Sequence, residues 1–85
     1  MSTAWRGDPA RATRLDNAER VASSIPDNAL KATGLREIAQ AAAAADGPGR
    51  AARLFGDAEQ AAASITDERT KARTLAAIAT TVAST

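Results

Sequence analysis

The stretch AERVASSIPD at residues 18–27 returns forty residues later as AEQAAASITD at residues 58–67. Aligning the chain with itself at a shift of 40 gives 12 identities in the 26 positions from Ala18 to Ala43. Alanine is abundant and raises this score, but isoleucine, leucine, aspartate, lysine and glutamate also coincide. A repeat of this length with helical spacing is typical of stacked helical hairpins. We therefore predict two copies of one hairpin, at residues 8–46 and 47–85, within a single domain spanning residues 1–85.

Apolar residues recur every three or four positions in four segments, which is the spacing of an amphipathic helix. Residues that stop or cap helices separate these segments: Pro26 with Asp27, the DGPG sequence at 46–49, and Asp67. Asp8 is the predicted N-cap of the first helix, with Pro9 at its first position. The expected helices span approximately residues 9–25, 28–46, 48–64 and 68–83. The residues predicted to face inward are Leu15, Ala18, Ala22 and Ile25 in the first helix, Ala32, Leu35, Ile38, Ala39 and Ala42 in the second, Leu54, Phe55, Ala58, Ala61 and Ile65 in the third, and Ala72, Leu75, Ile78, Ala79 and Val82 in the fourth.

The expected fold class is all-α. The connections inside the hairpins are short, so neighbouring helices should be antiparallel. Two arrangements then remain: a short α-solenoid of two stacked hairpins, or a closed four-helix bundle. The repeat favours the solenoid, because equivalent hairpins stack by translation with a small rotation.

The composition predicts a thin core. Of the 38 apolar residues, 24 are alanine, which has the best helix propensity but contributes little apolar surface. A chain of 85 residues is close to the size at which one core supplies only about 3–5 kcal/mol. Alanine also lets helix axes approach closely. We expect tight helix packing of marginal stability.

The charge balance and the missing residue types limit the possible functions. Eleven basic and ten acidic side chains are interspersed, which does not favour a nucleic-acid-binding surface. The chain has neither histidine nor cysteine, so no enzyme activity, metal or cofactor is predicted. The start of the sequence lacks the apolar core of a signal peptide, and no apolar run is long enough for a membrane span. We expect a cytoplasmic protein without nucleic-acid or membrane partners.

Both copies share the pattern PxRAxRL…AExxAxSIxD…KAxxLxxIA. This pattern, with its period of 39–40 residues, resembles the tetratricopeptide-like helical repeats found in tandem in actinobacterial proteins. The resemblance implies an α-solenoid that serves as a scaffold for protein interactions. The tetratricopeptide signature itself has a 34-residue period with tryptophan and tyrosine landmarks. This chain has no tyrosine, and Trp5 precedes the first helix, so no peptide-binding residue is carried over.

Four arginines recur at the start of the first helix of each hairpin. They could bind acidic groups along one face of the solenoid, or they could be solvated side chains whose stems cover apolar surface. Trp5 lies outside the repeat and could cap the first hairpin or anchor a partner. The four arginines are Arg11, Arg14, Arg50 and Arg53.

The fourth helix has a broad apolar arc that includes Ala76 and Ala83. A solenoid normally contains about three or more repeats with polar caps, and this helix has no polar cap. We therefore predict a non-enzymatic scaffold that self-associates into a homo-oligomer, such as a ring, cage or filament. The alternative is a monomeric adaptor that binds a peptide or protein along the first helices of the hairpins.

Overall fold

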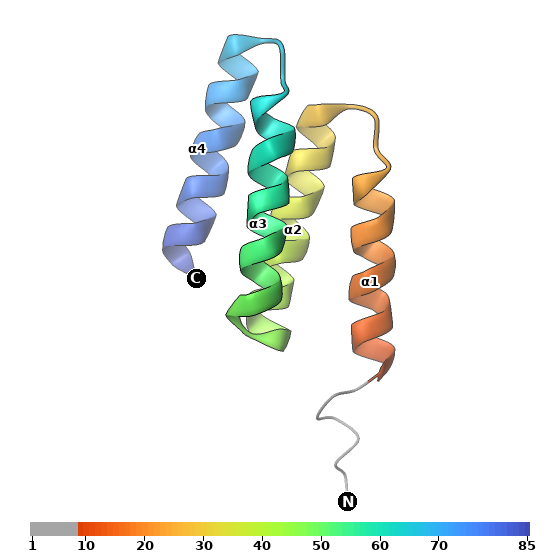
Figure 1. Cartoon of the computed structure of the whole chain (residues 1–85). Helices are drawn as coiled ribbons and strands as arrows, with labels where there is room; N and C mark the ends of the chain where they lie inside the picture. Colours follow the sequence, from red (N-terminus) through yellow and green to blue (C-terminus); the bar gives the residue numbers. More distant parts are fainter. Residues whose placement is uncertain (1–8) are drawn as a thin grey trace, which may run out of the picture.

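The computed structural model describes residues 9–85, without the side chains of Pro9, Arg11, Ala12 and Asp46. This part of the chain forms four α-helices and no strand (Figure 1). The prediction of an all-α fold with four helices is confirmed. The predicted cap of the first helix, Asp8, lies outside the described residues. The helices are α1 (Pro9–Ser23), α2 (Asn28–Asp46), α3 (Pro48–Ala63) and α4 (Glu68–Ser84).

The two hairpin loops have the same local structure. Asp27 precedes α2 and Asp67 precedes α4, with φ and ψ of −77° and 119° in the first and −76° and 117° in the second. The Asp27 carboxylate accepts a hydrogen bond from the Leu30 N–H at 3.0 Å, and Asp67 accepts one from the Thr70 N–H at 2.9 Å. Each carboxylate therefore satisfies a backbone donor that the first helical turn leaves unpaired, as predicted from the sequence.

Gly47 joins the two hairpins. Its φ of 87° and ψ of −171° lie in a region that only glycine occupies without strain. Pro48 follows directly as the first residue of α3, where the missing N–H costs no helical hydrogen bond. The chain therefore reverses between α2 and α3 within one residue, and the two helices pack against each other over their length.

The helices form an open array. Helix α2 contacts the other three helices and packs most extensively against α3, whereas α4 contacts α2 and α3. Among the described residues, the backbone of α1 approaches only α2. Helices α1 and α4 lie on opposite sides of the α2–α3 pair (Figure 1). A closed four-helix bundle would bring α1 against α4, so the arrangement matches the stacked hairpins.

Alanine dominates the core. The largest fully buried side chains are Leu35 of α2, Leu54 of α3 and Ile78 of α4. Around them, small side chains let the helices approach closely. The buried alanines are Ala22, Ala32, Ala39, Ala42, Ala51, Ala58, Ala61 and Ala62.

The inward face predicted for the fourth helix is wrong at three of its five positions. Ala72, Ala79 and Val82 are exposed, and Leu75 is only half-buried. Ile78 is buried as predicted, and beside it the buried side of α4 carries Thr81, which sequence periodicity did not identify. The apolar arc of α4 is wider than the surface that α2 and α3 contact, so part of it faces solvent. Of the residues predicted to face inward in the first helix, Ala22 is buried and Leu15 and Ala18 are half-buried. Ile25 is also half-buried but lies after the end of α1.

Truncation of the central leucine tests the core. Leu35 is 2% exposed, so Leu35→Ala should lower the free energy of unfolding by about 2–5 kcal/mol. Leu30 lies in the same helix but is 62% exposed, so Leu30→Ala is the matched control and should change stability by less than about 1 kcal/mol. Chemical denaturation measures both variants. Equal effects of the two substitutions would contradict the packing of α2.

Glycine substitutions test the joint between the hairpins. Gly47→Ala places a Cβ at a positive φ and should destabilise the fold by about 1–3 kcal/mol. Gly49 lies in the first turn of α3 with open space around a Cβ, so Gly49→Ala should be neutral or stabilising by up to about 1 kcal/mol. Thermal melts followed by circular dichroism compare the two variants. A Gly47→Ala protein as stable as Gly49→Ala would refute the constrained joint.

Candidate interaction surfaces

Helix α4 exposes an apolar surface whose counterpart on α2 is buried. We define the outer face of α4 as Ala72, Leu75, Ala79 and Val82. At a shift of 40, these residues correspond to buried positions of α2. Val82 is 44% exposed, whereas its counterpart Ala42 is fully buried. The counterparts of the other three are Ala32, Leu35 and Ala39, all of them buried.

Helix α1 exposes the matching surface at the opposite side of the molecule. We define the outer face of α1 as Leu15, Ala18 and Val21. Val21 is 66% exposed, while its counterpart in α3, Ala61, is 8% exposed. Leu15 and Ala18 are half-buried, and their counterparts Leu54 and Ala58 are fully buried. The difference arises because α3 packs against a helix on each side, whereas α1 has α2 alone.

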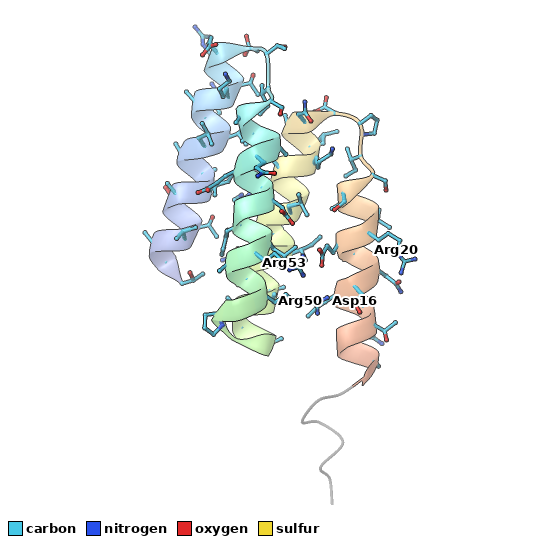
Figure 2. All side chains as sticks on the ribbon, in the orientation of Figure 1. Asp16, Arg20, Arg50 and Arg53 are labelled. Atoms are coloured by element: carbon cyan, nitrogen blue, oxygen red, sulfur yellow. The ribbon has the colours of Figure 1, made fainter. Side chains whose placement is uncertain are left out.

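Two of the candidate arginines, Arg50 and Arg53, connect α3 to α1. Figure 2 shows both side chains extending from α3 toward α1. Arg53 donates two hydrogen bonds to Glu19, at 2.6 Å from Nη1 to Oε2 and 3.2 Å from Nη2 to Oε1. Arg50 forms an ion pair with Asp16 and lies 3.7 Å from Glu19. These side chains bridge two helices whose backbones do not meet.

The bridge changes the titration of its acidic member. The hydrogen bond from Arg53 lowers the pKa of Glu19 below its ordinary value of 4.5, although partial burial opposes the shift. The carboxylate side chain is 20% exposed, and Arg53 also lies 3.9 Å from Asp57 of its own helix. The Glu19 carboxylate is thus stabilised in its charged form by the folded arrangement.

The counterparts of this bridge are exposed. Arg14 on α1 corresponds to Arg53 at a shift of 39, and Glu59 on α3 corresponds to Glu19 at a shift of 40. Both side chains are exposed, and neither pairs with another described residue. Each hairpin therefore carries one arginine and one glutamate of this kind. Within the described part of the chain, the arginine of the second hairpin pairs with the glutamate of the first, and the other arginine and glutamate stay apart.

The other candidate residues fall into two groups. Ala76 and Ala83 are exposed on α4 beside its outer face. Trp5 lies outside the described residues, and Arg11 is part of α1 without a described side chain. The four arginines do not all present free guanidinium groups along one surface, because Arg50 and Arg53 are engaged with α1.

A polar contact between α2 and α4 was not predicted. Arg36 donates a hydrogen bond from Nη1 to the Thr81 hydroxyl oxygen at 3.1 Å, in a partly buried position. The Thr81 hydroxyl itself donates to the Ala77 carbonyl at 2.9 Å. Arg36 and Thr81 are 45 positions apart, and their counterparts in the repeat are the alanines Ala76 and Ala41. Neither the spacing nor the repeat therefore signals this pairing.

Two shallow hollows lie on the described surface. One lies between the hairpin loops and includes Asp27, Ile65 and Asp67, and the other lies between α1, α2 and α3 and includes Lys31 and Gln60. Among residues 9–85, no group of three potential metal ligands comes together. No helix in this range has the length and apolar character needed to cross a membrane.

The chain was compared with models of protein families, with curated proteins and with solved structures, and none of these comparisons found a match. The resemblance to tetratricopeptide-like repeats therefore remains a prediction. The function has to be inferred from the surfaces of the molecule itself.

The Glu19–Arg53 bridge should make stability depend on pH. Because the pKa of Glu19 is lowered by folding, its contribution is complete above pH 4.5 and is lost as the pH falls through the lowered value. Glu19→Gln should destabilise the protein at pH 7 and reduce the loss of stability as the pH falls below 4.5. Denaturant titrations at several pH values measure this. Identical pH profiles for the two proteins would contradict the bridge.

Proposed function

We propose that this chain is a non-enzymatic helical-repeat scaffold of the tetratricopeptide-like kind, which acts in the cytoplasm by associating with further copies of itself. The observation that carries the proposal is the outer face of α4. Its four residues correspond to four buried residues of α2, yet Ala72, Ala79 and Val82 are exposed and Leu75 is only half-buried, at the edge of the core. A surface that is built like a helix–helix contact and lacks its partner helix favours association.

The small core supports the same conclusion. Among the described residues, only three large side chains are fully buried, and large apolar residues such as Val21 and Val82 remain in solvent. Burial of apolar surface contributes about 25 cal/mol per Å². Covering the outer faces of α1 and α4 between copies would add to a core that alanine keeps small. Folding and assembly would then be thermodynamically linked.

The adaptor hypothesis is less well supported. It requires the arginines of the first helices to bind an acidic partner, but Arg50 and Arg53 are already paired with Asp16 and Glu19. A ligand carboxylate would have to displace these pairs. The hollow beside Lys31 and Gln60 is shallow, and nothing else described along this side favours a peptide.

The oligomeric state and its dependence on concentration test the proposal. The mean mass in sedimentation equilibrium and the melting temperature should both rise with protein concentration, because association stabilises the folded state. Ala79→Glu should weaken association at least about tenfold and lower the melting temperature, since it would bury an unpaired charge.

Thr80→Glu provides the matched control. Thr80 is exposed next to Ala79, and its counterpart Gln40 is exposed in α2, which is packed by three helices. This variant should assemble like the unchanged chain. A protein that stays monomeric up to high micromolar concentration, with a constant melting temperature, would refute the scaffold and favour the adaptor.

A further inference from the structure

We infer that copies of this chain stack head to tail, with α1 and α2 of one copy docked on α3 and α4 of the preceding copy, and that an ion pair between Arg14 and Glu59 sets the register. This inference rests on the proposed self-association and specifies its geometry. It follows from one observation: the chain already contains one complete contact between its hairpins, and the residues for a second contact of the same kind lie exposed at its two sides.

The packing of α2 against α3 within the chain is the template for the apolar part of the contact between copies. Within the chain, Ala42 of α2 and Ala61 of α3 belong to the same buried core, to which both hairpins contribute. Their counterparts Val82 and Val21 are two of the three exposed large apolar residues among residues 9–85. These two valines lie on opposite sides of the molecule, one on each outer face. Head-to-tail stacking covers both in a single contact.

The ion pair between α1 and α3 within the chain is the template for the charged part of the contact between copies. Within the chain, the Arg53 guanidinium on the second hairpin reaches back to the Glu19 carboxylate on the first. Between copies, Arg14 of the following copy takes the position of Arg53, and Glu59 of the preceding copy takes that of Glu19. The charges are opposite, as the contact requires.

A third pair of positions is compatible with this register. Within the chain, Arg36 of α2 meets Thr81 of α4. The corresponding residues between copies are Ala76 of the preceding copy and Ala41 of the following one, and both are exposed. Two small apolar side chains replace a polar pair without leaving a buried polar group unpaired. Ala76, identified from the sequence as a candidate interaction residue, is thereby assigned a position in the contact.

A two-fold arrangement would not use these charges. In an isologous contact the same surface meets itself, so the outer face of α4 would pack on a second α4. Arg14 and Glu59 lie on different hairpins, and no contact of α4 with itself requires them to meet. The charge pair therefore distinguishes head-to-tail stacking from two-fold pairing.

Charge reversal tests the register. Arg14→Glu and Glu59→Arg should each weaken self-association about tenfold, because like charges then face each other between copies. Both residues are exposed and form no pair with another described residue, so the fold of each hairpin should be unaffected. Sedimentation velocity over a range of concentrations measures association, and circular dichroism checks the fold of each variant.

Mixing the two variants restores the opposite charges. Where an Arg14→Glu copy follows a Glu59→Arg copy, the new carboxylate at position 14 meets the new guanidinium at position 59. The original pair of Arg14 and Glu59 forms at the next contact. An equimolar mixture should therefore assemble like the unchanged chain, and so should the double variant Arg14→Glu/Glu59→Arg. The double variant has the composition of the unchanged chain, so it also controls for net charge.

The outcomes separate this inference from the proposed function. If the unchanged chain assembles but the single variants assemble equally well, the head-to-tail register is wrong and the scaffold stands. The same holds if neither the mixture nor the double variant recovers association. If the unchanged chain is monomeric at every concentration, the proposed function itself fails. Recovery in both the mixture and the double variant is the result expected.

Discussion

The close contact of α2 with α3 is the constraint on which the rest of the structure depends. It is built from alanines that are completely buried, such as Ala32 and Ala39 on α2 and Ala58 on α3. A side chain of this size lets two helix axes approach closely, and the positive φ of Gly47 permits the reversal that places them together. The cost is a small core, because alanine removes little apolar surface from water when it is buried.

Because the hairpin is repeated, the surface that packs inside the first copy occurs again in the second copy, where it is exposed. A hairpin whose second helix is shaped for close contact with the next hairpin has that shape in every copy. In the first copy the surface is covered and gives the core of the molecule, whereas in the second copy it faces solvent as the outer face of α4. The same reasoning applies in reverse to α1. The exposure of Val21 and Val82 is therefore a consequence of the repeat.

Much of the fold could be predicted from the sequence, because helix ends depend on local residues. Asp27 and Asp67 cap neighbouring backbone groups, and periodic apolar spacing identified the buried face of α2 and α3 correctly. On α4, the burial of Ile78 was predicted correctly, but the exposure of Ala72, Ala79 and Val82 was not, because the apolar pattern does not show which side of the helix has a neighbour. The pairing of Arg53 with Glu19 was also missed, because it joins residues 34 positions apart that meet only through the fold.

The contact between copies would differ from the one within the chain in two compensating ways. Within the chain, both Asp16 and Glu19 pair with arginines, but the residue corresponding to Asp16 at a shift of 40 is Gly56, so one ion pair is lost between copies. In exchange, Val21 and Val82 stand where the internal contact has alanines. An exposed ion pair contributes little, and valine buries more apolar surface than alanine. The bulkier side chains would also hold the helices further apart than α2 and α3. Stacking between copies would therefore depend mainly on apolar burial, with Arg14 and Glu59 fixing its direction and register.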